Sequence, residues 1–264
     1  MIPPRLSLLG VEVDAITPAE VLDFVSETRR AGARAVIANH NLHSVALCRR
    51  SKALRRFYAE AERIQIDSTP MIAWGRLIGL SLSRENRSTY LDWREAFWAR
   101  AEAEGWRVFH LGGAPGVGER AIAAIKARRP GLILGGRHGF FAVEGRENGA
   151  VLADVAACRP DVLLVGMGMP RQELWIAANR EHLPRCAVLP VGAAFDYEAG
   201  VVPTPPRWTG RLGLEWLWRL AAEPRRLAGR YLIEPWTILP AALGDLARRV
   251  NPSFSRSGPR SPSE

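Results

Sequence analysis

The feature that most constrains the fold is a regular alternation of short apolar runs with amphipathic stretches of helical length. Three consecutive units show it clearly, because each apolar run is followed by a stretch with helical periodicity. The runs are WRVFHLGG at 106–113, GLILGG at 131–136 and DVLLVGMG at 161–168. Parallel strands that are buried on both faces have this composition, and helices connect them. The sequence therefore predicts an α/β fold, with a Rossmann-like, mostly parallel sheet and helices on both faces.

Further segments extend this pattern. Thr17, Pro18 and Glu20 combine a capping box with a first-turn proline, which predicts a helix start. Apolar patterning predicts additional strands at 6–14, 34–38, 63–67 and 187–194. Helices are predicted at 42–61, from Thr69 or Pro70 onward, at 90–104, and after the three runs at 117–129, 148–158 and 172–181.

The alternation ends after Asp196, and a proline-rich break, PTPPRW at 203–208, follows. We therefore expect an α/β domain over 1–201 and a basic, aromatic helical appendage over 202–250. The tail at 251–264 is rich in serine, proline and arginine. Such a composition buries too little apolar surface to fold, so the tail is predicted to be disordered.

The appendage combines tryptophan with arginine. It holds Trp208, Trp216, Trp218 and Trp236, which are four of the nine tryptophans of the chain. The formal net charge of +9 favours anionic partners. Indole rings lie at the headgroup depth of a membrane, and guanidinium groups bind anionic lipid or a diphosphate. A packed helical subdomain with a solvated arginine face explains the composition equally well.

Several classes of protein and site are disfavoured. Cys48, Cys158 and Cys186 are scattered singly, which argues against a disulfide framework or a zinc site and fits a reducing compartment. His40 and His43 share a turn but lack an evident third metal ligand. The sequence has no GxxxxGK[ST] loop, GxSxG elbow or DxD motif. It shows neither a signal peptide nor the ~20 apolar residues of a spanning helix, so any membrane contact is expected to be peripheral.

Ligands of an open α/β sheet bind at the carboxyl ends of its strands. That rule selects the residues that follow the predicted strands as the walls of one cleft. They are Asn39 to Asn41, Asp67 and Ser68, Gly112 to Gly116, His138 and Gly139, Gly166 to Pro170, and Asp196. Asp67 has two interpretations, a general base facing the cleft or the N-cap of the next helix.

Two glycine-rich loops carry signals of different strength. GGAPGVG at 112–118 lets backbone N–H groups approach a diphosphate, but a tight βα turn explains it equally well. GMGMPRQE at 166–173 is more specific, because Gln172 and Glu173 begin a helix whose N-terminus favours an anion. The amide of Gln172 can hold a base or a sugar hydroxyl. Capping of the helix is the alternative role for this pair.

Together these motifs resemble the WecG/TagA/CpsF glycosyltransferase family, from about Leu8 to Leu232. The matching stretches are IDS at 66–68, RSTYLD at 87–92, VFHLGG at 108–113, HGFF at 138–141, DVLLVGMGMPRQE at 161–173, GAAFDYEAG at 192–200 and GLEWLWRLAAEPRRLAGRYL at 213–232. The last stretch and the loop containing Pro170, Gln172 and Glu173 are highly specific together.

The resemblance implies an inverting transfer of a sugar from a UDP-sugar to a polyprenyl-diphosphate-linked saccharide. The site would lie at the inner face of a bacterial membrane, on the cytoplasmic side, and serve synthesis of exopolysaccharide or another surface glycan. It makes 1–201 the catalytic domain and Asp67 the base. The residues selected for substrate binding are Asn39, Asn41, Arg87, Asp92, Gly112, Gly113, Gly168, Pro170, Gln172, Glu173, Asp196, Arg219, Arg225, Arg226 and Arg230.

The same resemblance sets the expected partners. They are the UDP-sugar donor, the lipid-linked acceptor and an anionic membrane surface. No metal ion, cofactor or nucleic acid is expected. Family members self-associate, which leaves a homo-oligomer open.

The chain departs from the family pattern at four positions. Ser68 and Tyr90 replace glycines, Asn39 replaces a threonine, and Thr204 replaces an arginine. These departures leave the donor sugar open, and also a catalytically inactive, membrane-associated paralogue. A dinucleotide-dependent oxidoreductase is a second alternative, based on the α/β alternation and the glycines at 112–118. A non-enzymatic basic scaffold is a third.

Overall fold

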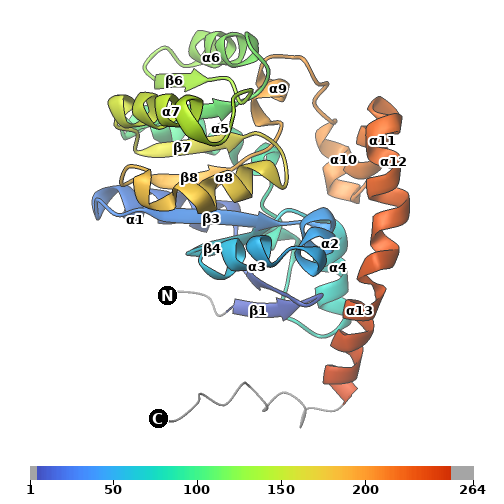
Figure 1. The fold of residues 1–264 in the computed structure, drawn as a ribbon. Coiled ribbons are helices and arrows are strands. Elements are labelled where there is room, and N and C mark those ends of the chain that lie inside the picture. Colours follow the sequence, from blue (N-terminus) through green and yellow to red (C-terminus); the bar gives the residue numbers. More distant parts are fainter. Residues whose placement is uncertain (1–4, 251–264) are drawn as a thin grey trace, which may run out of the picture.

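The centre of the molecule is a six-stranded parallel sheet with the strand order β4-β3-β8-β7-β5-β6 (Figure 1). The computed structural model describes residues 5–250, so the tail at 251–264, predicted to be disordered, lies outside the described residues. The strands are β3 (Ala35–His40), β4 (Arg63–Ile66), β5 (Arg107–Gly112), β6 (Ile133–Arg137), β7 (Val162–Gly166) and β8 (Ala187–Pro190). The predicted α/β class with a parallel sheet is confirmed.

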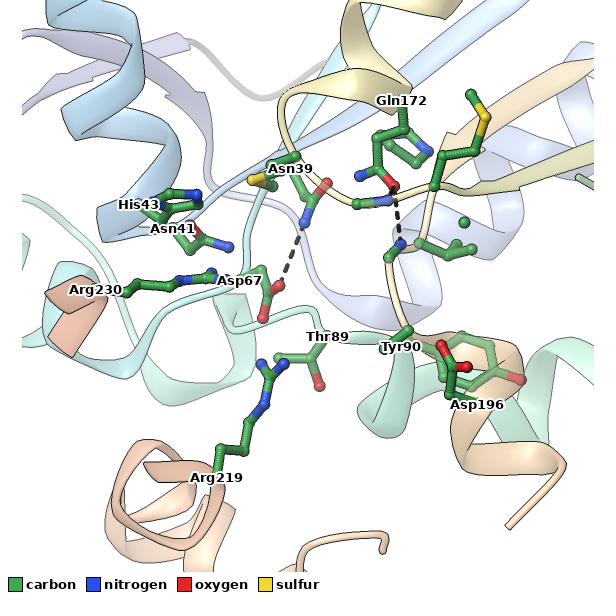
Figure 2. Close-up of a pocket in the computed structure, with 18 of the residues that line it drawn as sticks. Asn39, Asn41, His43, Asp67, Thr89, Tyr90, Gln172, Asp196, Arg219 and Arg230 are labelled. Carbon is green, nitrogen blue, oxygen red and sulfur yellow. Dashed lines mark hydrogen bonds between the residues drawn. The ribbon is translucent and has the colours of Figure 1, made fainter. Parts of the chain in front are cut away.

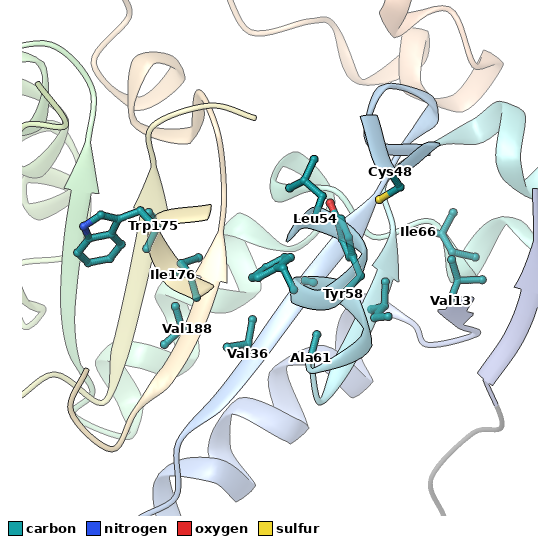
Figure 3. Packing of buried hydrophobic residues seen from close by; sticks show 14 of the residues in the cluster. Val13, Val36, Cys48, Leu54, Tyr58, Ala61, Ile66, Trp175, Ile176 and Val188 are labelled. Carbon is teal, nitrogen blue, oxygen red and sulfur yellow. The ribbon is translucent and has the colours of Figure 1, made fainter. Parts of the chain in front are cut away.

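Helices cover both faces of the sheet because the strand residues alternate between two apolar cores. On β7, Leu163 and Val165 belong to the first core, whereas Val162 and Leu164 belong to the second. The first core, part of which Figure 3 shows, is closed by α2 (Leu42–Arg50), α3 (Lys52–Ala59), α7 (Gly145–Cys158) and α8 (Arg171–Asn179). The second is closed by α1 (Pro18–Arg30), α5 (Tyr90–Ala103), α6 (Val117–Arg128) and α9 (Ala194–Glu198).

The first segment of the chain is a hairpin, so the single strand predicted there is wrong. β1 (Arg5–Leu8) pairs antiparallel with β2 (Val11–Asp14). Between them Leu9 and Gly10 adopt φ angles of 54° and 75°, the left-handed conformation of a two-residue hairpin turn. Leucine is not a typical turn residue, so no local pattern marks this turn. The backbone N–H of Ile64 donates to Asp14 Oδ2 at 2.7 Å and joins the hairpin to β4.

The long helix predicted at 42–61 is divided into α2 and α3. Ser51 separates them, with extended backbone angles (φ −122°, ψ 114°). Its hydroxyl accepts a hydrogen bond from Leu54 N and caps α3. Serine competes with helical backbone bonding in this way and therefore favours caps over helix interiors.

The remaining elements are helices between the strands and a series of helices that follows α9. They are α4 (Thr69–Leu77), η1 (Arg84–Asn86), η2 (Arg180–His182), α10 (Arg207–Leu212), α11 (Glu215–Ala222), α12 (Pro224–Ala228), the π-helical η3 (Gly229–Ile233) and α13 (Glu234–Val250). None of the helices in the described part of the chain is long and apolar enough to cross a membrane.

The last helix, α13, returns to the α/β body and packs along α2 (Figure 1). Asp245 accepts hydrogen bonds from Leu9 N (2.8 Å) and from Trp74 Nε1 (3.0 Å). Ile238, 4% exposed, joins the first core. The division at residue 202 stays a prediction, and these contacts attach the end of the predicted appendage to the hairpin and to α4.

Candidate functional site

A cleft of about 1000 Å³ opens at the carboxyl ends of the parallel strands. Its walls are the loops that follow the six parallel strands on one side and the appendage on the other. Of the residues predicted from sequence, it brings together Asn39, Asn41, Asp67, Gly113, Gly168, Gln172, Asp196, Arg219 and Arg230 (Figure 2).

Asp67 follows β4 and points into the cleft (Figure 2). The N-cap of α4 is Ser68, whose side chain accepts from Met71 N at 3.4 Å. The capping role considered for Asp67 therefore belongs to its neighbour. Asn39 Nδ2 donates to Asp67 Oδ2 at 3.3 Å. Burial raises the pKa of Asp67 to about 6, against the opposing charges of Arg87 and Arg219.

The two asparagines after β3 play different parts. Asn41 caps α2, since its side chain accepts from Ser44 N at 3.1 Å. Asn39 uses its amide nitrogen on Asp67, while its Oδ1 is buried and has no hydrogen-bond partner among the described residues. Asn39 therefore orients the carboxylate of Asp67 through its amide nitrogen.

Arg219 and Arg230 reach from the appendage toward Asp67 (Figure 2). Burial lowers the pKa of Arg230 from its ordinary value, and the nearby positive charge of Arg219 adds to this effect. Arg219 Nε is buried and lacks a hydrogen-bond partner within the part of the chain that the structure describes. Two adjacent, partly desolvated guanidinium groups favour an anion with several oxygens, such as a diphosphate.

A smaller cavity of about 360 Å³ adjoins the cleft. It lies between the first turns of α2 and α4 and the appendage, and its walls include Thr69, Trp216 and Tyr231. The residues that line both cavities are Asn41, His43, Asp67, Glu215, Arg219 and Arg230. Asp67 is therefore accessible from two directions.

Arg87 and Asp92 lie beside this junction and are held by other protein groups. Arg87 is 7% exposed and donates from Nη2 to Glu215 Oε2 at 2.5 Å, which joins the body to α11. It lines the smaller cavity only. Asp92 Oδ2 accepts from the backbone and hydroxyl of Thr89 at 3.1 and 2.8 Å, so it forms the capping box of α5. A substrate contact for either residue stays a prediction.

Four other predicted residues, Gly112, Pro170, Glu173 and Arg225, do not line the cleft. Gly112 ends β5, and a Cβ atom there would lie 2.3 Å from Gly166 O, so its role is to let two strands approach. Pro170 precedes α8, and Arg225 is exposed. The side chain of Arg226 lies outside the described residues. Glu173 is 1% exposed and lies behind Gln172.

Gln172 uses its side chain on the protein. Its Oε1 accepts from Gly168 N at 3.1 Å and from Gly192 N at 3.2 Å, and its Nε2 donates to Glu173 Oε1 at 2.8 Å. The amide retains one N–H for a ligand. This bonding differs from the base or sugar contact expected from the sequence, which stays a prediction.

Sequence reasoning missed several residues of the cleft. His43 was considered only as a metal ligand, yet its Nδ1 lies 2.6 Å from Glu234 Oε2 and joins α2 to α13. Burial lowers the pKa of His43, and Glu234 opposes this shift. Other lining residues that were not selected include Thr89, Tyr90, Phe140, Arg171, Tyr197 and Glu223, whereas Met167, selected by its place after a strand, does line the cleft. Phe140, Arg171 and Tyr197 directly follow selected residues in the sequence, whereas the place of the others depends on tertiary packing.

The arrangement suits proton transfer beside a bound anion. A carboxyl group with a pKa of about 6 accepts a proton readily near neutral pH. The two arginines supply the positive charge that a diphosphate leaving group needs. Among the described residues, no group of three or more His, Cys, Asp or Glu side chains is placed to hold a metal ion.

Comparison with known protein families agrees with this geometry. The chain matches the glycosyl transferase WecG/TagA/CpsF family over residues 6–252. That span includes the hairpin, the sheet with its covering helices, and the appendage up to α13. The chain therefore belongs to the WecG/TagA/CpsF family of glycosyltransferases.

Proposed function

We propose that this protein is an inverting, metal-independent glycosyltransferase that moves a sugar from a UDP-sugar to a polyprenyl-diphosphate-linked saccharide. Its family transfers sugars to lipid-linked acceptors in cell-surface glycan synthesis. The proposal adds the donor nucleotide, the stereochemical course and the catalytic groups, with exopolysaccharide as one such glycan. The observation that carries it is the position of Asp67 on the shared wall of two cavities.

Inverting transfer needs the donor and acceptor on opposite sides of the anomeric carbon. We place the UDP-sugar in the 1000 Å³ cleft and the acceptor saccharide in the 360 Å³ cavity. Asp67 takes the proton of the acceptor hydroxyl as its oxygen bonds to the anomeric carbon. The bond from that carbon to the phosphate oxygen breaks, and UDP leaves with the electron pair.

Arg219 and Arg230 are the groups proposed to stabilise the departing diphosphate. Preorganised positive charge in a site shielded from water stabilises developing negative charge more strongly than it does in bulk water. This role replaces the metal ion that many sugar transferases hold with a DxD motif. If the proposal is correct, activity should persist in EDTA, and a strict Mg²⁺ or Mn²⁺ requirement would overturn the metal-independent part.

The exposed apolar side chains of the appendage support a peripheral position on an anionic membrane. The exposed ones are Trp208, Leu214, Trp216, Leu217, Trp218, Leu232, Ile233, Trp236, Leu239, Leu243 and Leu246. Two acidic side chains of the same helix are directed toward the protein: Glu234 lies within hydrogen-bond distance of His43, and Asp245 is 5% exposed. Tryptophan and arginine together suit the interface of the inner leaflet, where the lipid-linked acceptor would be met.

The decisive experiment supplies a panel of UDP-sugars with a short polyprenyl-diphosphate-linked saccharide and identifies the product by mass. Addition of one sugar residue, with inverted anomeric configuration, supports the proposal. Thermal shift with UDP and with NAD separates it from the oxidoreductase alternative. Protein that binds UDP and forms no product with any donor would favour the inactive paralogue.

A further inference from the structure

A pair of buried polar side chains lies behind the donor side of the cleft. Gln172 and Glu173 lie in the first turn of α8 and are each 1% exposed. Glu173 faces the first core, where its charge acts on Cys48 and Tyr58. Buried side chains of this kind are normally hydrogen-bonded, so the bonds that they make define their role.

The orientation of the Gln172 amide follows from its neighbours. Gly168 N and Gly192 N are both donors, at 3.1 and 3.2 Å, so only the oxygen of the amide can face them. The amide nitrogen then points the other way, where Glu173 Oε1 accepts from it at 2.8 Å. The carboxyl group of Glu173 therefore stabilises the orientation in which the oxygen of Gln172 accepts hydrogen bonds from both loops.

Those two loops form the middle of the cleft wall. The loop after β7 contains Gly168, and the loop after β8 contains Gly192. Both glycines have positive φ angles, 78° and 54°, and neither would meet an atom within 4 Å if it carried a Cβ. A backbone bond from Val191 N to Val165 O (2.8 Å) joins the bases of these loops, and the two bonds to the single oxygen of Gln172 join them again at Gly168 and Gly192.

We propose that Glu173 is a positioning residue for donor binding, which acts through Gln172 to hold the loops after β7 and β8. The identity of the ligand rests on the proposed function, because the wall that these loops form is the one assigned to the UDP-sugar. Glu173 itself does not line the cleft.

The environment of Glu173 is consistent with a residue kept for such a role. Its Oε2 is buried and has no hydrogen-bond partner among the described residues. Burial raises the pKa of Glu173 to about 7. An unpaired buried carboxyl oxygen destabilises the fold, and such costs are characteristic of functional sites.

The test compares substitutions matched in shape. Glu173→Gln keeps an oxygen that accepts from Gln172, whereas Glu173→Met keeps the length of the side chain and removes that oxygen. Gln172→Met removes the shared acceptor directly. Asn179→Leu is the control, because Asn179 is a buried amide on the same helix that bonds Trp175 O and Asn148 away from the cleft.

The first measurement is hydrogen exchange of the Gly168 and Gly192 amides in the full chain without ligand. We expect Glu173→Met and Gln172→Met to accelerate exchange at both glycines, and Glu173→Gln and Asn179→Leu to leave it unchanged. If Glu173→Met does not fold, the two other single variants decide the same question. Gln172→Met should accelerate exchange at both glycines, and Glu173→Gln should not. Unchanged exchange in a folded methionine variant, or equal acceleration in Asn179→Leu, would overturn the proposal.

The second measurement is UDP affinity. Loss of one buried hydrogen bond typically costs a factor of about ten or more, so Glu173→Met should weaken UDP binding about tenfold, with Glu173→Gln restoring it. Wild-type affinity in Glu173→Met would contradict a role in donor binding. If the wild-type chain does not bind UDP, the donor assignment fails, while the exchange experiment still decides whether Glu173 positions the loops.

Discussion

At the scale of single residues, the sequence offered two roles for Asp67, the N-cap of α4 and a general base, and the structure gives the cap to its neighbour Ser68. Ser68 caps α4, and Asp67 is free to face both cavities. Asp67→Asn should therefore lower turnover about 10²–10⁴-fold with the fold retained, the usual contribution of a general base. Ser68→Ala is the matched control, and it should lower stability by about 1 kcal/mol with little effect on chemistry. Near-normal turnover of folded Asp67→Asn would exclude this role.

The raised pKa of Asp67 also gives a pH dependence with a definite sign. The base must be ionised, so kcat/KM should fall as the pH decreases through about 6. Arg87 is the first cation that opposes the raised pKa, so Arg87→Met should move this limb to higher pH. The exposed Arg56 provides a control substitution. If the acidic limb of the kcat/KM profile does not move in Arg87→Met, that limb does not report the ionisation of Asp67.

The contribution of Asp67 to the free energy of unfolding should decrease with rising pH, whereas kcat/KM should increase. The folded protein binds the Asp67 proton more tightly than the unfolded chain, whose carboxyl pKa is near 3.8. The stability that this group contributes is present below that value and is lost as the pH rises through about 6. Asp67→Asn removes this loss, so the variant should melt at a higher temperature than the wild type at pH 8. The difference should decrease toward pH 4, and thermal melts at both pH values check it.

At the scale of elements, the appendage helices differ in where they direct their arginines. Arg219 on α11 and Arg230 in η3 line both cavities, whereas Arg225 on α12 is exposed. Arg219→Met and Arg230→Met should therefore weaken UDP binding and lower turnover. Arg225→Met, which removes the same charge, should leave both near wild type at moderate salt. Equal losses in all three variants would indicate a general electrostatic effect of net charge.

At the scale of the whole molecule, the appendage and the α/β body share few core residues. Among the described residues, Ile238 is the one buried residue of the first core that belongs to the appendage. The second core contains no buried residue of the described appendage. Deletion from Val202 should leave a folded domain, but with a lower Tm, because Asp245 no longer bonds Leu9 and Trp74. Circular dichroism and thermal melts test this part.

The same truncation tests the membrane contact. The shortened chain should lose binding to anionic vesicles and nearly all activity. Full-length binding should weaken as salt rises, because basic residues near the surface contribute ~1 kcal/mol each, while a salt-resistant part should remain from buried tryptophan. Co-sedimentation across a salt series measures both parts. If the truncated chain sediments as well as the full chain, the appendage is a structural subdomain only.

The sequence by itself determined the class of fold and the edge of the sheet where the site lies. Apolar runs of strand length and helical periodicity are local properties, and parallel strands place their carboxyl ends together. Position after a predicted strand was therefore enough to select Asn39, Asp67 and Gly168. The family motifs added the appendage arginines.

Only the tertiary structure decided how these side chains are used. The bond from Asn39 to Asp67 and the bond from Gly192 to Gln172 depend on which groups meet in space. Pairs such as Arg87 with Glu215 and His43 with Glu234 join residues more than 120 positions apart. No local pattern encodes such distant pairs, and the pKa of Asp67 depends on burial that only the packed molecule creates.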